Sequence, residues 1–124
     1  MASPMSEWQP IVVEMTAYCP CAKCCGRGAH GVTADGTKTN AVWYNFAGDR
    51  TTFNFKDEIY VPLGHGILDR TRMDDRVFQV DDRGGALDTE RSETGIPRLD
   101  LRVRDHWWAV QFGRKRILIF LRRP

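Results

Sequence analysis

Two stretches of alternating apolar and polar residues predict strands near the two ends of the chain. Apolar side chains take every second position over residues 11–18 and again over residues 98–103, which is the period of a half-buried strand. In the second stretch Asp100 lies on the polar face, between two leucines. Residues 117–121 form a continuous apolar run, which predicts a strand buried on both faces.

Shorter segments fill the chain between these strands. Residues 59–61 and 77–80 predict short strands, and residues 51–55 are rich in strand-forming types. Residues 37–49 lack a clear period and predict a loop or a short helix. Residues 87–97 are polar throughout, which predicts an exposed loop.

One short helix is predicted between Asp105 and Gly113, which suit its N-cap and its C-terminal end. Its adjacent tryptophans, Trp107 and Trp108, cannot share a face, so one is expected in the core and the other partly exposed. Many short strands with glycine-rich turns favour a small closed barrel over a sandwich, because closure removes edges that short strands cannot protect.

Composition limits the class of protein. The chain has 124 residues, of which 42% are hydrophobic and 27% charged, as expected of one globular domain. We assign residues 10–124 to that domain and residues 1–9 to a flexible N-terminal segment. A formal net charge of +2 is too small to predict binding to nucleic acid. No apolar run reaches the roughly 18 residues of a membrane span, and residues 1–10 show no secretory signal.

Acidic residues at strand ends are the candidate chemistry. The strand predicted over residues 77–80 runs into two aspartates, and a glycine pair follows. Taken alone, this segment is typical of a β-turn. Asp57 and Asp100 also lie beside predicted strands, and with Asp82 they make three acidic positions suited to general acid–base catalysis.

Four short motifs follow one another along the chain. They are Asp57 with Val-Pro-Leu-Gly at 61–64, Asp-Asp-Arg-Gly-Gly-Ala-Leu at 81–87, Arg-Leu-Asp-Leu at 98–101, and Phe-Gly-Arg at 112–114. In this order they resemble the 3D domain, a family named for three aspartates. The family includes stationary-phase survival proteins and the C-terminal barrel of MltA-type lytic transglycosylases, and it is related to RlpA-like barrels. The resemblance covers residues 11–121 and implies a mainly β fold: a six-stranded double-psi β-barrel with one or two short helices.

The resemblance also implies a peptidoglycan lytic transglycosylase. Such an enzyme cleaves the β-1,4 bond between N-acetylmuramic acid and N-acetylglucosamine and leaves a 1,6-anhydro ring. Asp100 would be the acid/base, Asp82 its like-charged neighbour, and Asp57 the residue that orients the pair or holds a sugar hydroxyl. Asp81 is the alternative to Asp82, which is preferred for its spacing to the glycine pair. The implied substrate-binding positions are Thr16, Tyr18, Thr33, Gly84 and Gly85.

The implied partner is a peptidoglycan glycan strand, and no cofactor is required. The implied place of action is the bacterial cell wall, reached in the periplasm, outside the cell or by phage delivery. One departure from the family concerns its short link before the third aspartate, since residues 87–97 form a longer segment here. A barrel that binds glycan or protein without catalysis is therefore the second hypothesis.

All four cysteines lie within seven residues, at positions 19–25. Two local disulfides, such as Cys19–Cys24 with Cys21–Cys25, suit an exported enzyme and are favoured. A zinc site is the alternative, although zinc ligands usually come as two separated pairs. Free thiols are a third possibility, because spacing alone does not determine pairing. A metal-binding module built on these cysteines is the remaining functional alternative.

Overall fold

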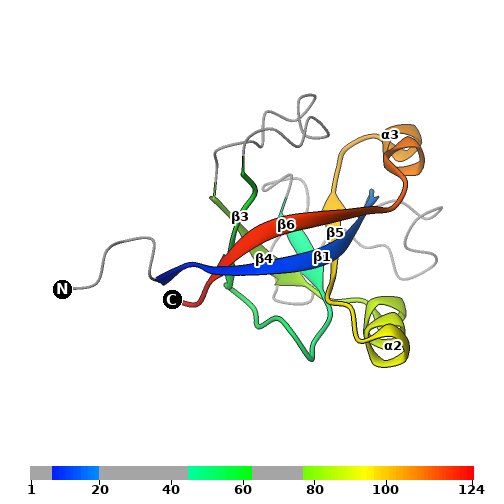
Figure 1. Ribbon diagram of the computed structural model, residues 1–124. Helices are drawn as coiled ribbons and strands as arrows, with labels where there is room; N and C mark the ends of the chain where they lie inside the picture. Colours follow the sequence, from blue (N-terminus) through cyan, green and yellow to red (C-terminus); the bar gives the residue numbers. More distant parts are fainter. Residues whose placement is uncertain (1–6, 20–44, 63–76) are drawn as a thin grey trace.

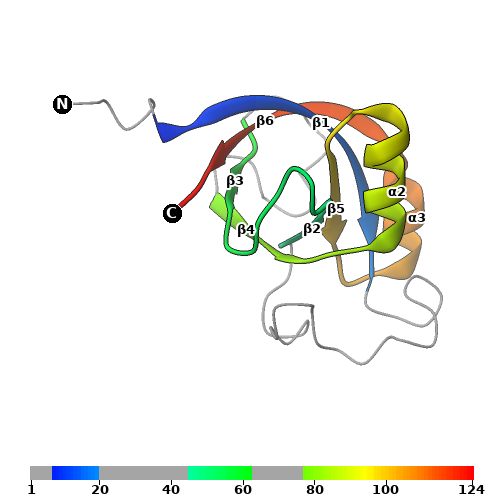
Figure 2. The ribbon, with the colours of Figure 1, turned by 90° about the horizontal axis from the view of Figure 1, so that it is seen from below.

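Six strands close into a barrel in the computed structural model, which describes residues 7–19, 45–62 and 77–124. Two helices lie at the end of the barrel where the first strand finishes and the last begins (Figures 1 and 2). The elements are β1 (Gln9–Tyr18), β2 (Phe46–Gly48), β3 (Glu58–Tyr60), β4 (Val77–Asp82), α2 (Gly85–Thr94), β5 (Arg98–Arg102), α3 (His106–Phe112) and β6 (Lys115–Arg122).

The order of strands around the barrel is β1-β5-β2-β4-β3-β6. Two pairs are parallel, β1 with β5 and β2 with β4, and the other four are antiparallel. Exchanging β1, β2 and β3 with β4, β5 and β6, respectively, leaves every pair of neighbouring strands unchanged in kind. The two halves of the chain therefore have equivalent topology. The predicted closed barrel is confirmed, and its topology is compatible with a double-psi barrel.

The core lies inside the barrel and is built from alternate residues of the strands. β1 contributes Val13 and Met15, β5 contributes Leu99 and Leu101, and all four are fully buried. β1 is confirmed as a strand and begins at Gln9, two residues before the predicted start. Residues 1–6 of the predicted N-terminal segment lie outside the described residues.

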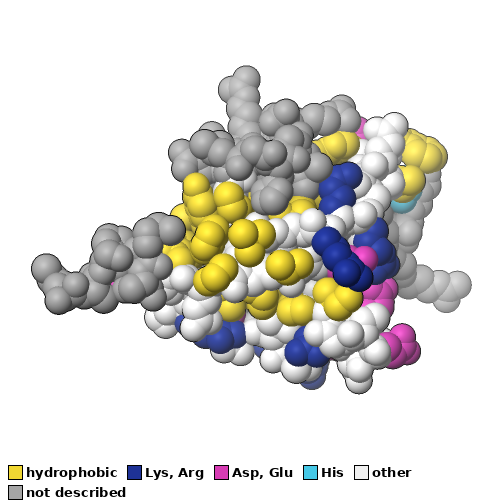
Figure 3. All heavy atoms as spheres, viewed as in Figure 1, with side chains coloured by type: hydrophobic (Ala, Val, Ile, Leu, Met, Phe, Trp, Pro, Cys, Tyr) yellow, Lys and Arg dark blue, Asp and Glu magenta, His cyan; other side chains and the backbone are white. Residues whose placement is uncertain are grey.

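β6 is a strand as predicted, but the prediction that it is buried on both faces is wrong. Ile119 is fully buried, whereas the neighbouring Leu118 is 40% exposed. Leu118 pairs across the ladder with Val12 of β1, which is 53% exposed. An apolar band therefore follows the outer face of this strand pair, where Figure 3 shows yellow side chains gathered.

Helix α2 replaces the exposed loop that was predicted over residues 87–97. Leu87 is its only buried residue, so the segment has no apolar stripe to reveal a helix. Gly95 ends the helix with a φ of 74°, and its N–H donates to the carbonyl of Arg91, which is the usual left-handed helix end. Most of the segment that is longer than the link of the resembled family is thus part of a helix packed on the barrel.

Two further predictions near β2 are corrected. Residues 46–48, expected in a loop or short helix, form β2, and residues 51–55, expected to be strand-like, form a turn. In that turn the N–H of Phe53 donates to the carbonyl of Asp49 at 3.0 Å. A Cβ on Gly48 would come within 2.9 Å of the Phe53 ring, so this close approach needs glycine.

Helix α3 has the predicted bounds and cap. The Asp105 carboxylate accepts the backbone N–H groups of Trp107 and Trp108 at 2.8 and 3.3 Å, and Gly113 ends the helix. Trp107 is 65% exposed while Trp108 packs against the core, as predicted. Neither helix in the described ranges has the length and apolar character to cross a bilayer.

Candidate functional site

The backbone register aligns Asp100 and Asp82 in one row across four strands. Asp100 of β5 pairs with Thr16 of β1 on one side and with Ala47 of β2 on the other. Ala47 in turn pairs with Asp82 of β4. Adjacent strands lie about 4.8 Å apart, so the two aspartates stand roughly 10 Å apart along the backbone. Only a methyl group separates them in this row, which leaves space above Ala47.

That space is a pocket of about 410 Å³. It is formed where β1, β4 and β5 meet the start of α2, at the helical end of the barrel (Figure 1). Two of the three predicted catalytic aspartates therefore share one pocket. Its lining residues are Tyr18, Ala47, Asp82, Arg83, Gly84, Gly85, Ala86, Leu87, Arg98 and Asp100.

The Asp100 side chain is half-buried at the pocket, on the face of β5 opposite to Leu99 and Leu101. Its neighbours Leu99 and Leu101 are fully buried, and the Thr16 hydroxyl donates to its Oδ1 at 3.0 Å. Burial raises the pKa of Asp100 to about 6, against the lowering effects of the Thr16 hydrogen bond and the Arg98 charge. The Asp82 charge raises this pKa further, but it is a smaller cause than burial. The expected effect of a like-charged neighbour is thus present as a minor contribution.

Asp82 accepts hydrogen bonds at both carboxylate oxygens. The Tyr18 hydroxyl donates to Oδ2 at 3.0 Å, and the backbone N–H of Arg83 donates to Oδ1 at 2.9 Å. Burial, with the Asp82 charge second, raises the pKa of Tyr18 well above its ordinary range. The phenol therefore keeps its proton and remains a donor to Asp82.

Asp81 and Asp82 are adjacent in β4 but have different partners. Asp81 is 2% exposed, and its two oxygens accept from the Arg102 guanidinium at 2.9 and 2.7 Å. The Asn45 side chain donates to the same carboxylate at 3.1 Å. Asp81 is therefore part of a buried ion pair, whereas Asp82 faces the pocket. The choice of Asp82 over Asp81, which was made from its spacing to the glycine pair, stays a prediction.

Asp57 does not line the pocket with the other two aspartates. Its carboxylate accepts the backbone N–H of Asn54 at 2.8 Å and lies 3.4 Å from the Arg123 guanidinium. Its carbonyl accepts the N–H of Val80 at 2.9 Å. These contacts hold the turn before β3 against β4, and they give Asp57 no contact with Asp82 or Asp100.

The glycine pair opens α2 and does not form the β-turn of which the segment taken alone is typical. Gly84 is the N-cap, with an extended φ of −150°, and Gly85 is the first helical residue. A Cβ built on Gly85 would meet no atom within 4 Å. Gly85 therefore leaves open space at the pocket wall, which agrees with a position where a bound chain passes close to the backbone.

Arg98 is a site residue that the sequence reasoning did not select. It is 3% exposed and lines the pocket. Its guanidinium donates to the Glu14 carbonyl at 2.7 Å and to the Thr16 hydroxyl at 3.0 Å. The signal was present, because residues two apart in a strand share a face and Arg98 stands two positions before Asp100.

The cysteine cluster is represented here by Cys19 alone, which is buried. Its Sγ lies 3.6 Å from Nδ1 of His106 on α3. Cys21, Cys24, Cys25 and the predicted substrate-binding residue Thr33 lie outside the described residues. Among the residues that the structure describes, no group of three or more His, Cys, Asp or Glu side chains is placed to hold a metal ion.

Comparison with known proteins identifies no relative of this chain. Scans against protein-family models and against curated proteins both find no match to the chain. The evidence for a function therefore comes from the pocket itself and from the resemblance of the four motifs.

Proposed function

We propose that the protein is a peptidoglycan lytic transglycosylase and that Asp100 is its acid/base catalyst. The observation that carries the proposal is the Asp100 carboxyl, whose pKa burial raises to about 6, facing Asp82 across a shared pocket. A carboxyl with a raised pKa keeps a proton near neutral pH and can donate it to a leaving group. Paired carboxyls with different surroundings are the usual arrangement for glycosidic cleavage.

In the proposed reaction Asp100 donates its proton to the glycosidic oxygen as the bond from that oxygen to C1 of the muramic acid breaks. The 6-hydroxyl of the same muramic acid then attacks C1, and its proton returns to the Asp100 carboxylate. The products are a 1,6-anhydro sugar and a free hydroxyl on the departing chain. No water is consumed, and Asp100 ends in its starting form.

Asp82 faces the positive charge that develops at C1 as the bond breaks. Hydrogen bonds from Tyr18 and from the Arg83 backbone fix both of its oxygens, so it requires little reorganisation during the reaction. Asp57 has no direct part in this proposal, because it lies at the turn before β3. The open wall at Gly85 gives room for the sugar chain.

The test is digestion of purified peptidoglycan by the full chain, followed by mass spectrometry of the products. We expect muropeptides lighter by one water than those from hydrolysis. Asp100→Asn should reduce their release by about 10²- to 10⁴-fold, which is the usual contribution of a general acid. Asp82→Asn should also reduce release. Asp88→Asn is the matched control, since this carboxylate pairs with Arg50 and does not line the pocket.

Each other outcome contradicts a defined part of the proposal. Products carrying a hydrated reducing end would make the protein a hydrolase. Binding to peptidoglycan without any product would favour the non-catalytic barrel. Full activity in Asp100→Asn would remove the acid/base assignment while leaving the activity itself in place.

A further inference from the structure

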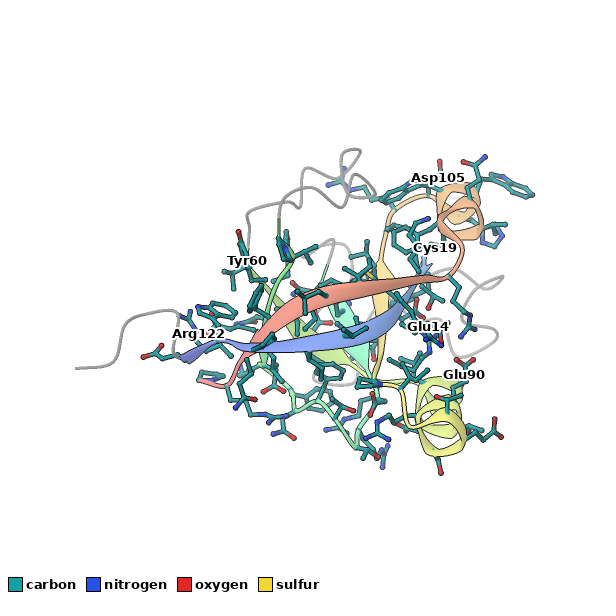
Figure 4. The ribbon with its side chains drawn as sticks, in the orientation of Figure 1. Glu14, Cys19, Tyr60, Glu90, Asp105 and Arg122 are labelled. Atoms are coloured by element: carbon teal, nitrogen blue, oxygen red, sulfur yellow. The ribbon has the colours of Figure 1, made fainter. Side chains whose placement is uncertain are left out.

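Helix α2 is tied to the barrel by a network of four charged side chains beside the pocket. Glu90 of α2 accepts from Nε of Arg98 at 2.8 Å and from Nη1 of Arg114 at 2.7 Å. Arg114 also lies 3.4 Å from the Glu14 carboxylate on β1. Figure 4 shows Glu14 and Glu90 close to each other between β1 and α2, and Figure 3 shows basic and acidic side chains adjacent on this surface.

A chain of hydrogen bonds leads from this network to the candidate acid. Nε of the Arg98 guanidinium donates to Glu90, and Nη2 donates to the Thr16 hydroxyl at 3.0 Å. Thr16 then donates to Oδ1 of Asp100, also at 3.0 Å. Because the Thr16 oxygen accepts from Arg98, its hydroxyl hydrogen is directed toward Asp100. The chain of hydrogen bonds runs from α2 to β5, then to β1 and back to β5.

The hydrogen-bonded chain begins on the part of the molecule that is unlike the family. Asp100 and Arg98 belong to a motif of the resemblance, but Glu90 lies in the longer segment between the second and third aspartates. Glu90 is also not a pocket-lining residue. It can therefore act on the candidate acid only through Arg98 or through its charge.

We propose that Glu90 is a positioning residue for Asp100, and that α2 controls the protonation of the candidate acid through the chain Glu90–Arg98–Thr16. This inference rests on the proposed function, in which Asp100 donates a proton. Glu90 balances the positive charge of Arg98 and fixes its guanidinium against Thr16. Arg114 also pairs with Glu90 and thereby reduces the effect of the Glu90 charge on Arg98 and Asp100.

The charges around Asp100 give the expected sign of each effect. Asp82 of β4 and Glu90 of α2 both favour the protonated form, while Arg98 of β5 and the Thr16 hydrogen bond favour the ionised form. Removing the charge of Glu90 should therefore lower the pKa of Asp100. Removing Arg114 leaves Glu90 less neutralised, so the pKa of Asp100 should rise.

Two variants that break the same ion pair should thus have opposite effects. We expect the pKa of Asp100 to fall in Glu90→Gln and the same pKa to rise in Arg114→Gln, each by on the order of half a pH unit. Carboxyl-carbon NMR titration of the full chain measures this pKa directly. A role confined to packing α2 would move both variants in the same direction. Asp88 lies on the same helix and pairs with Arg50, which is outside the helix. Asp88→Asn should therefore leave the pKa of Asp100 unchanged.

The titration separates this inference from the proposed function. It needs no substrate, so it can succeed or fail whether or not anhydro-muropeptides are released. If they are released, the alkaline limb of the pH profile should shift down in Glu90→Gln and up in Arg114→Gln. Shifts of equal sign, or no shift in either variant, would overturn the role of Glu90 and leave the lytic activity to be judged on its own products.

Discussion

A single carboxyl, that of Asp100, combines the properties that proton transfer to a sugar oxygen needs. β5 places it between two fully buried leucines, and Thr16 and Arg98 restrain it from one side. The burial that favours its protonated form also makes its ionised form unfavourable in the folded protein. Stability and the proposed activity therefore oppose each other at this residue.

Replacement of Asp100 by Asn should stabilise the protein at high pH. The pKa of this acid is about 6 in the folded chain, above its unfolded value of about 3.9. The stability that the protonated Asp100 side chain contributes to the folded protein is thus complete below pH 3.9 and is lost as the pH rises through 6. Asn removes that loss, so the free energy of unfolding should increase by up to about 3 kcal/mol at pH 8 and change little at pH 4. Urea unfolding at both pH values measures this; an equal effect at pH 4 and pH 8 would contradict it.

At the level of elements, α2 does three things in one segment. Its N-terminus forms a wall of the pocket through the glycine pair, and Leu87 anchors it to the barrel. Farther along, Glu90 connects it to Arg98 and Arg114. A helix held by charged contacts and one apolar residue can carry function on a polar face that a loop would not keep in place.

Substitution of Gly85 by Ala should separate stability from activity. Gly85 is helical with a negative φ, so Ala fits and should raise the free energy of unfolding by about 0.4–1 kcal/mol. Its methyl group projects into open space at the pocket wall, so cleavage of peptidoglycan should fall. Urea unfolding and muropeptide release test the two halves. An unchanged rate of release would show that the glycan does not pass close to Gly85.

At the level of the whole molecule, closure of the barrel brings together residues that are far apart in sequence. One row of paired residues contains Thr16 and Ala47 from the first half of the chain and Asp82 and Asp100 from the second half. A buried ion pair joins Asp81 of β4 to Arg102 of β5, across the intervening β2. The pair thereby helps to fix the relative positions of the strands that carry Asp82 and Asp100.

Loss of the buried ion pair should destabilise the entire fold. Asp81→Asn removes the charge of the carboxylate that pairs with the fully buried Arg102, and such a change lowers the free energy of unfolding by about 3–5 kcal/mol. Thermal or urea unfolding measures the loss. The exposed pair of Arg50 with Asp88 offers a control, because Asp88→Asn should change stability by less than about 1 kcal/mol. Similar values for the two variants would show that the buried pair does not brace the barrel.

Local patterns in the sequence were sufficient for several elements. Period-two alternation located β1 and β5, and the Asp105 cap with Gly113 located α3. These succeeded because strand alternation and capping are properties of neighbouring residues. Alternation alone also predicted that Asp100 lies on the polar face between buried leucines. The same reasoning failed for β6, where a continuous apolar run concealed an exposed outer face.

Only the tertiary structure decided which acidic residues share a site. The motifs of the sequence placed Asp57, Asp82 and Asp100 in one expected site, but the closed barrel places the last two in one pocket and Asp57 at a separate turn. The segment predicted as a polar loop is helix α2 in the structure, since ion pairs with Arg50, Arg98 and Arg114 stabilise a helix that has almost no apolar face. The sequence by itself determined the strands other than β2 and the residue types at their ends. Which of those residues meet depends on strand register around a closed barrel, and register arises from contacts between residues far apart in the chain.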